Sequence, residues 1–257
     1  MRVRSVQYFI CIGLVAWTAS SQAAAQTAAT PGNAPAPPVP VLSGQPEAGG
    51  GGFAMGGVRW LNLTSINNRM RSEGYPEFGR NFYTLGGGGQ VVFHRFVIGG
   101  EGNAVLPFDG SRNTAGSRQR LSGGFGLFRF GYAVIDTGSF RVFPLVGFGY
   151  GGMTLNLSRK GDSTFGEVLA NPAREASMTA GGLLLDAGLG ADYRIAFSRA
   201  RRHTGFFSFG VRGGYLFVPY TTDWSMSGGK VADGPALGLS GPYVQLMLGL
   251  GSASTAP

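Results

Sequence analysis

The stretch LLLDAGLGADYRI, residues 183–195, decides the fold class of this 257-residue chain. Its odd-numbered positions, from Leu183 to Ile195, are all apolar. Its even-numbered positions after Leu184 are glycine, aspartate or arginine. Side chains that alternate with a period of two belong to a β-strand. The stretch therefore predicts a strand with one apolar face and one face of small or charged groups.

The same kind of pattern recurs along the chain without a repeated sequence. The alternation is least regular in residues 120–132 and 140–155, so the facing of those two stretches stays open. Together with 183–195, the stretches predict eight strands. The other seven are residues 53–61, 83–93, 96–104, 120–132, 140–155, 207–217 and 243–251.

The connections between these strands alternate in length. Long polar connections cover residues 62–80, 106–119, 156–178 and 218–241. Short connections cover residues 94–95, 133–139 and 196–204. Transmembrane β-barrels have long loops at one end and tight turns at the other, with both termini at the turn end.

The two faces of the strands favour a membrane barrel over a soluble one. Glycine and charged residues share the faces opposite the apolar ones, which suits the narrow interior of an eight-stranded barrel. We predict that six charged residues pair there as a structural network: Arg59, Glu101, Asp186, Asp192, Arg194 and Arg212. In the alternative, a soluble periplasmic β-sandwich, the same six would be solvated strand positions.

Aromatic residues near the strand ends predict two belts at the membrane interfaces. The belt at the long-loop end would contain Trp60, Tyr83, Tyr215 and Tyr243, and the belt at the short-turn end Phe93, Phe96, Tyr193 and Phe207. The fold class predicted is all-β, an eight-stranded antiparallel transmembrane β-barrel.

The N-terminal segment predicts export. Arg2 and Arg4 precede an apolar core at residues 8–17, and alanines 23–25 offer a cleavage site. We predict a signal peptide at 1–25, a Pro/Ala-rich periplasmic linker at 26–48, the barrel at 49–251 and a tail at 252–257. The single cysteine, Cys11, lies in the signal peptide, so the mature chain would have neither disulfides nor thiolate metal sites.

The composition agrees with a folded β protein. The 46 glycines argue against a mainly helical chain, since each costs about 1 kcal/mol in a helix. A hydrophobic content of 43 % argues against disorder. We interpret glycines such as Gly188, Gly190 and Gly210 as lumen-facing positions that leave room for charged side chains.

The glycine-rich strands LVGFGYGGMTL (145–155) and GPYVQLMLGLG (241–251) carry a family resemblance. Over residues 49–251 the chain resembles small eight-stranded outer-membrane barrels of the opacity-protein and OmpA/OmpX type. The resemblance implies an outer-membrane location, contact with outer-membrane lipid and lipopolysaccharide, and assembly by the barrel-assembly machinery.

Two short motifs look like catalytic or binding sequences. Residues 147–152 match G-x-G-x-x-G, but a nucleotide site needs a helix next, and β-like sequence follows. Asp136-Thr137-Gly138 matches the aspartic-protease triplet, which would need a second aspartate from another copy. A tight turn is favoured there instead.

The histidines argue against catalysis at the long-loop end. His94 and His203, the two histidines, both fall in short connections. A lipid-modifying barrel enzyme would need a histidine near the long loops as a base. We therefore predict that the chain is not an enzyme and has no cofactor and no metal site.

The basic excess consists almost entirely of arginine. Loss of Arg2 and Arg4 with the signal lowers the basic count from 21 to 19 against 13 acidic residues, a net charge of +6. Seven arginines fall in the long connections: Arg69, Arg71, Arg80, Arg112, Arg118, Arg159 and Arg174. Since guanidinium groups match phosphate geometry, they are candidates for binding lipopolysaccharide phosphates or surface anions. Solvated loop charge is the alternative, and nucleic acid is not an expected partner.

The predicted function follows from the architecture. We predict a non-enzymatic outer-membrane barrel with a plugged lumen, which serves envelope integrity or binds an extracellular ligand through its four long loops. The alternative is a narrow channel or carrier for small hydrophobic molecules across the outer membrane.

Overall fold

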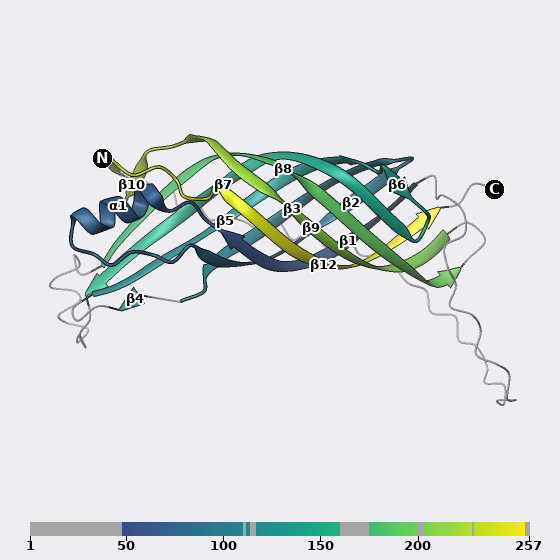
Figure 1. Ribbon diagram of the computed structural model, residues 1–257, viewed down its shortest axis with the longest axis horizontal. Coiled ribbons are helices and arrows are strands. Elements are labelled where there is room, and N and C mark those ends of the chain that lie inside the picture. Colours follow the sequence, from purple (N-terminus) through teal and green to yellow (C-terminus); the bar gives the residue numbers. More distant parts are fainter. Residues whose placement is uncertain are drawn as a thin grey trace, which may run out of the picture. The chain divides into compact units, whose positions relative to one another are not determined.

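A computed structural model of the chain describes residues 48–109, 112–113, 117–159, 175–199, 203–227 and 229–254. Within these residues, eight antiparallel strands form a closed ring (Figure 1). Each strand pairs with the next along the chain, and the last pairs with the first. The predicted eight-stranded barrel is therefore confirmed. The strands are β1 (Ala48–Trp60), β2 (Asn81–Phe93), β3 (Phe96–Pro107), β5 (Ser117–Tyr132), β7 (Phe140–Arg159), β8 (Glu175–Arg199), β9 (His203–Thr221) and β12 (Gly241–Ser254).

Short elements mark the two ends of the barrel (Figure 1). The long connections contain α1 (Thr64–Ser72), β4 (Arg112–Asn113), β10 (Trp224–Met226) and β11 (Gly229–Val231). We call this end the long-loop end. The other end, with β6 (Ile135–Asp136) and the His94–Arg95 turn, is the short-turn end. Among the described residues, no helix is long and apolar enough to cross a membrane.

Burial follows the alternation predicted from the sequence. On β8, Leu185 and Leu189 are 44 % and 62 % exposed, whereas Asp186 and Asp192 are 4 % and 3 % exposed. On β12, Leu246 is 66 % exposed and Gln245 is fully buried. An apolar exterior around a polar interior is the arrangement of a transmembrane barrel, inverted from that of a soluble one.

The facing of β5 and β7, which the sequence left open, is set by pairing. Phe125 and Arg129 of β5 point inward and are buried, whereas Phe128 and Phe130 point outward. Phe128 pairs with Phe148 of β7, so the exposed rings of both strands share one face. The pattern was ambiguous because β5 carries large apolar residues on both faces.

The predicted aromatic belt needs one correction. Trp60, Tyr83 and Tyr215 lie on the outside, with exposed fractions of 37–49 %. Tyr243 is 1 % exposed and lies inside the barrel. Since Val244 and its alternate neighbours face outward on β12, Tyr243 has to face the lumen.

The strands are longer than predicted. The pairing of β7 with β8 continues to Ser158 opposite Glu175. At the other end, Ala48 pairs with Ser254, so the barrel begins one residue earlier than predicted and takes in the start of the predicted tail. The predicted signal peptide and residues 26–47 of the predicted linker lie outside the described residues.

Candidate functional site

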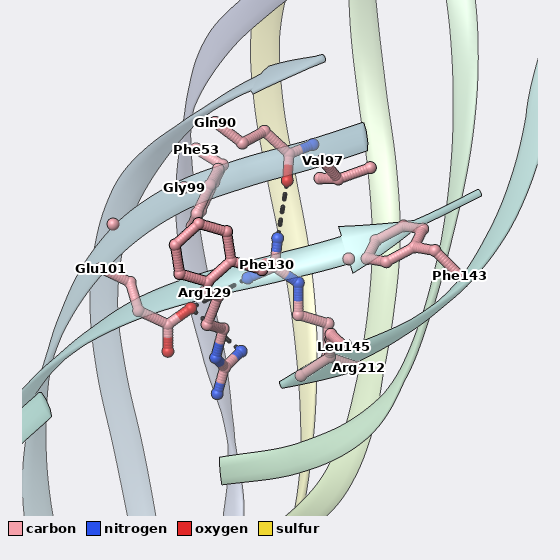
Figure 2. A pocket seen from close by; sticks show the side chains of 12 residues that line it. Phe53, Gln90, Val97, Gly99, Glu101, Arg129, Phe130, Phe143, Leu145 and Arg212 are labelled. Carbon is pink, nitrogen blue, oxygen red and sulfur yellow. Dashed lines mark hydrogen bonds and ion pairs between the residues drawn. The ribbon is translucent and has the colours of Figure 1, made fainter. Parts of the chain in front are cut away.

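The lumen contains a buried ion-pair cluster centred on Glu101 of β3 (Figure 2). Its Oε2 lies 3.1 Å from Arg129 Nη1 of β5 and 2.9 Å from Arg212 Nη1 of β9. Asn103 Nδ2 donates to the other carboxylate oxygen at 3.0 Å. The Glu101 carboxylate of β3 therefore binds side chains from β5 and β9. Strand β9 is not a neighbour of β3 or β5 in the ring.

A second carboxylate extends this cluster toward β8 and β12. Asp186 Oδ2 lies 3.1 Å from Arg129 Nε and accepts from the Tyr243 hydroxyl at 3.2 Å. Arg129 Nη2 also donates to the Tyr243 hydroxyl oxygen at 3.2 Å. Arg129 thus bridges both carboxylates, and Tyr243 closes the contact across the barrel.

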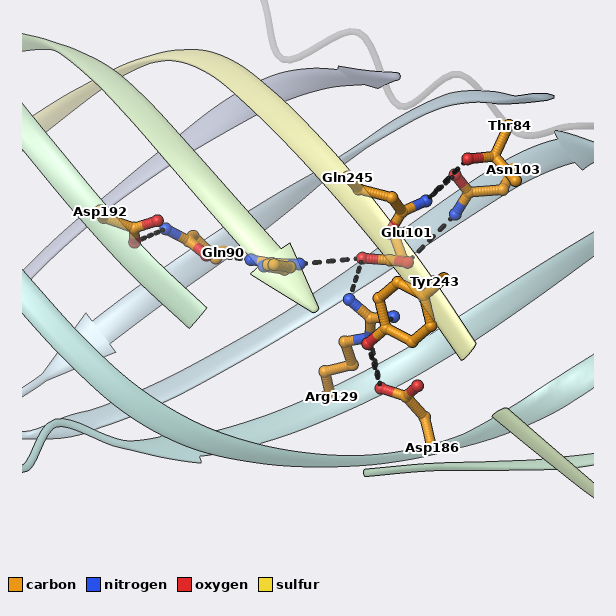
Figure 3. Close-up of polar contacts among 10 residues, drawn as sticks. Thr84, Gln90, Glu101, Asn103, Arg129, Asp186, Asp192, Tyr243 and Gln245 are labelled. Carbon is orange, nitrogen blue, oxygen red and sulfur yellow. Dashed lines mark hydrogen bonds and ion pairs between the residues drawn. The ribbon is translucent and has the colours of Figure 1, made fainter. Parts of the chain in front are cut away.

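Gln90 of β2 links the central cluster to a third carboxylate (Figure 3). Its Oε1 accepts from Arg212 Nη2 at 2.7 Å, and its Nε2 donates to Asp192 Oδ2 at 3.2 Å. A continuous polar path therefore runs inside the barrel from Asp192 to Asp186.

Arg59 differs from the other lumen arginines. It is fully buried, and none of its guanidinium nitrogens has a hydrogen-bond partner among the described residues. The guanidinium carbon lies 4.5 Å from the Phe125 ring centroid and 5.0 Å from that of Tyr243. Cation–π contact with two rings is therefore its main described stabilisation.

A separate ion-pair cluster closes the short-turn end. Asp136 of β6 accepts from Arg141 Nε at 3.2 Å and from Arg194 Nη2 at 3.1 Å. The same carboxylate accepts the Gly138 backbone N–H at 3.0 Å, and Gly138 has a φ of +82°. Asp136 therefore shapes its turn and also forms ion pairs with two buried arginines.

Two inward-facing glycines leave room for the charged groups. A Cβ at Gly210 would lie 2.6 Å from Asp192 Oδ1. A Cβ at Gly147 would lie 3.0 Å from Arg129 Cγ and 3.4 Å from Asp186 Cβ. The interpretation of glycines as lumen spacers is incomplete, however, because alternate glycines such as Gly87 and Gly89 face outward with Leu85 and Val91.

The long-loop half of the interior is mainly apolar, with the buried Gln119 of β5 as a polar member. Helix α1 contributes Ile66 and Met70, and the connection before β12 contributes Leu237 and Leu239. These residues pack with buried side chains of the barrel wall into one hydrophobic cluster. The wall residues are Phe82, Val105, Leu121, Phe125, Leu127, Met153, Leu155, Ala180, Leu184 and Leu216.

Hydrogen bonds join the first and last long connections into a single cap over this cluster. Asn62 N donates to Ser240 O at 2.8 Å, and Ala236 N donates to Ser65 Oγ at 3.2 Å. Trp224 Nε1 donates to Pro235 O at 2.6 Å and is part of the apolar cluster. The cap is therefore a packed structure that is continuous with the barrel interior.

Two small cavities lie beside these groups. A cavity beside Glu101, Arg129 and Arg212 has a volume of about 10 Å³ (Figure 2). A second, beside Arg141 and Arg194, has about 20 Å³. Each has room for about one water molecule.

All six charged residues expected in the lumen are buried there, with exposed fractions of 0–8 %. Sequence reasoning missed other members of the same clusters. Arg129 and Arg141 were missed because the facing of their strands was open, and Asp136 because its turn-forming sequence explained it already. Gln90 was missed because it carries no charge.

The seven arginines predicted to bind surface anions lie in different kinds of structural element. Arg69 and Arg71 lie on α1, exposed, and form pairs with Glu73 and Glu77. Arg118 and Arg159 belong to β5 and β7, because strand pairing continues past the predicted ends of these strands. Arg112 lies in β4, the short strand within the second long connection. Arg80 is exposed just before β2, and Arg174 lies outside the described residues.

The two short motifs have structural roles. Residues 147–152 lie within β7, which continues as a strand to Arg159, so these residues do not form the loop before a helix that a nucleotide site needs. Asp136-Thr137-Gly138 forms the turn described above, and the Thr137 N–H donates to Phe140 O at 2.9 Å. His94 occupies the β2–β3 turn with a φ of +55°.

Comparison with known proteins gives distant structural similarity. No family model matches the sequence, and no curated protein matches it. Ail, the attachment invasion locus protein of Yersinia pestis, matches with a TM-score of 0.35 and 10 % identity, over 82 % of this chain and 99 % of Ail. The outer membrane protease OmpT from Escherichia coli matches with a TM-score of 0.33 and 8 % identity, over 84 % and 100 %. At these scores the similarity assigns no activity to this chain.

The comparison nevertheless corrects one prediction. The sequence led us to predict that the chain is not an enzyme. We had based that prediction on the barrel architecture and on the positions of the histidines. It is wrong, because OmpT, found among the structural matches, is named a protease. The absence of histidine from the long loops is no ground for excluding catalysis.

Proposed function

We propose that this chain is an outer-membrane barrel with a sealed lumen, which acts through the surface of its long-loop end in envelope integrity or surface interaction. In this proposal the chain is exported by its N-terminal signal, inserted by the barrel-assembly machinery and oriented with the long loops outside. The resemblance to barrels of the opacity-protein and OmpA/OmpX type is part of the same proposal.

The observation that carries the proposal is the filling of the interior. Two ion-pair clusters and one apolar cluster follow one another along the lumen, and α1 with residues 234–240 covers the long-loop end. A pore needs a continuous water-filled path, and the two described cavities each have room for about one water. A protein whose lumen is sealed has to act through its outer surfaces.

The same observation argues against a channel or carrier. A small hydrophobic molecule entering from the long-loop end would have to displace Ile66, Met70 and Leu239, which are buried at 0–6 % exposure. Beyond them it would meet the ion-paired Glu101 cluster, where an apolar molecule would displace charged groups from their partners.

Surface digestion of intact cells tests the location and orientation. The proposal expects protease added outside to cut the chain within the long connections, and an epitope inserted at residues 94–95 to stay protected. Deletion of the gene should alter detergent sensitivity or surface adhesion. Complementation should require the cap, tested with a variant in which residues 62–80 are replaced by a short turn. Recovery of the chain as a soluble periplasmic protein would overturn the proposal.

A further inference from the structure

The charges buried inside the barrel do not balance. Among the described residues, five arginines with exposed fractions of 0–5 % face four buried carboxylates. The arginines are Arg59, Arg129, Arg141, Arg194 and Arg212, and the carboxylates are those of Glu101, Asp136, Asp186 and Asp192. The described interior therefore carries one net positive charge. Because a buried charge without a counter-charge is costly, this excess favours uptake of one negative charge.

Two of these arginines share a single carboxylate at the short-turn end. Arg141 and Arg194 are 1 % and 5 % exposed, and each forms an ion pair with Asp136 through one nitrogen. Arg141 Nη2 and Arg194 Nε are buried and have no hydrogen-bond partner among the described residues. Two guanidinium groups on one carboxylate repel each other, and a buried N–H group without an acceptor costs free energy. Each of the two arginines therefore has a donor available for a further acceptor.

The larger of the two described cavities, about 20 Å³ in volume, lies against both arginines. Part of its wall is the backbone of residues 49–52 of β1, four glycines that have no side chain to fill the lumen. Ser208 and Gln90 add a hydroxyl and an amide to the wall, and both groups can donate a hydrogen bond. Donors from β2, β7, β8 and β9 thus surround a space of about one water molecule.

Asp192 also lines this cavity and would repel an anion. Its Oδ2 accepts a hydrogen bond from Gln90 Nε2 at 3.2 Å. The carboxylate does not satisfy Arg141 Nη2 or Arg194 Nε, which have no hydrogen-bond partner among the described residues. Asp192 therefore limits the affinity of the cavity for an anion without supplying the acceptor that the two arginines lack.

The other buried arginines offer a poorer place for an anion. The Arg59 guanidinium lies against the Phe125 and Tyr243 rings, and Arg59 lines neither described cavity. The smaller cavity, about 10 Å³, has Glu101 in its wall, and this carboxylate already pairs with two arginines. The cavity beside Arg141 and Arg194 therefore has the most suitable donors and the most room.

We propose that this cavity binds one monatomic halide anion, chloride under ordinary conditions, with Arg141 Nη2 and Arg194 Nε as donors. Phosphate and carboxylate groups are too large for a space of about one water molecule. The ion neutralises the net charge of the interior and fills the lumen at the short-turn end. The inference goes beyond the proposed function and does not depend on the orientation of the barrel in the membrane.

Urea unfolding of the barrel in phospholipid vesicles tests the proposal, with chloride exchanged for gluconate at constant ionic strength. Gluconate carries the same charge but is too large for the cavity. A single site in the folded state predicts that, above the dissociation constant, each tenfold rise in chloride lowers the unfolding equilibrium constant about tenfold. R194Q loses the charge beside the cavity, so its stability should be the same in chloride and in gluconate.

D192N provides a variant that should bind the anion more tightly. It keeps both arginines and removes the carboxylate charge that faces the cavity, so the affinity for chloride should rise by about tenfold or more. D223N is the matched control, because it loses the same charge at an exposed pair with Lys230, and its chloride dependence should equal that of wild type. If R194Q fails to fold, D192N and D223N decide the outcome.

Diffraction from crystals of the folded barrel grown in bromide locates the ion directly. Anomalous scattering should place one bromide in the cavity, in contact with Arg141 and Arg194. Equal stability of the wild-type protein in chloride and gluconate would overturn the proposal. So would a D192N variant that binds chloride no more tightly than wild type, a bromide found only elsewhere, such as beside Arg59, or a cavity that contains water alone.

Discussion

Replacement of Glu101 by glutamine tests whether the central ion-pair cluster stabilises the barrel. The side chain keeps its shape but loses the charge that faces Arg129 Nη1 at 3.1 Å and Arg212 Nη1 at 2.9 Å. Arg129 would keep its ion pair with Asp186, whereas Arg212 would lose its described ion pair and keep its hydrogen bond to Gln90 and its contact with the Phe53 ring. Breaking a buried ion pair from one side costs about 3–5 kcal/mol, because a desolvated charge remains.

Urea denaturation of the barrel in phospholipid vesicles, followed by tryptophan fluorescence, measures this cost. With a slope of about 2 kcal/mol per molar urea, the midpoint of E101Q should fall by about 2 M. E77Q is the matched control, because Glu77 pairs with Arg71 on the exposed surface. There the loss should be below about 1 kcal/mol.

A double-mutant cycle separates the ion pair from other effects of the substitution. E101Q/R212M removes both charges, so its unfolding free energy should exceed the additive expectation by about 2 kcal/mol. A midpoint for E101Q within the range of E77Q would refute the reasoning, since the lumen charges would then be hydrated or paired otherwise.

Three further substitutions test other layers of the structure. L185R places a charge on the membrane-facing surface, where Leu185 is 44 % exposed, and should cost about 2–4 kcal/mol in vesicle refolding; an unchanged stability would argue against lipid contact. Y243F removes hydroxyl contacts to Asp186 and Arg129 and should cost about 1–3 kcal/mol by urea denaturation, whereas Y220F, at a residue 64 % exposed, should change nothing measurable. I66A should loosen the cap, so limited proteolysis should cut residues 62–80 faster while heat-modifiable migration of the barrel persists; an unchanged cutting rate would show that Ile66 does not hold the cap.

The alternation of side chains predicted the barrel because it is strictest where the two faces meet the most different surroundings. On β8, lipid on one side and ion pairs on the other leave no ambiguity, so Asp186 and Asp192 could be placed in the lumen. On β5 the inward Phe125 and the outward Phe128 meet apolar surroundings alike. The side-chain pattern of β5 therefore could not show that Arg129 faces the lumen. The pairing of β5 with β3 and β7 does show it.

Other features depend on contacts that are distant in sequence. Helix α1 has no side-chain cap, and its buried Ile66 and Met70 pack against the connection before β12, about 170 residues later. Tyr243 is an aromatic residue of the type found in interfacial belts. It faces inward because it lies two residues from Gln245, whose side chain also faces the lumen. Asp136 had a sufficient local explanation as a turn residue, so its pairing with Arg194 could not be read from the sequence.

Single-channel recording with the purified, folded protein in planar lipid bilayers tests the sealed lumen most directly. The filled interior predicts no discrete conductance steps for the wild-type protein at moderate voltage. The same result is expected for I66A, because the Glu101 cluster still closes the barrel beneath the cap. Stable open-channel currents from the wild-type protein would contradict the sealed barrel and support the channel alternative.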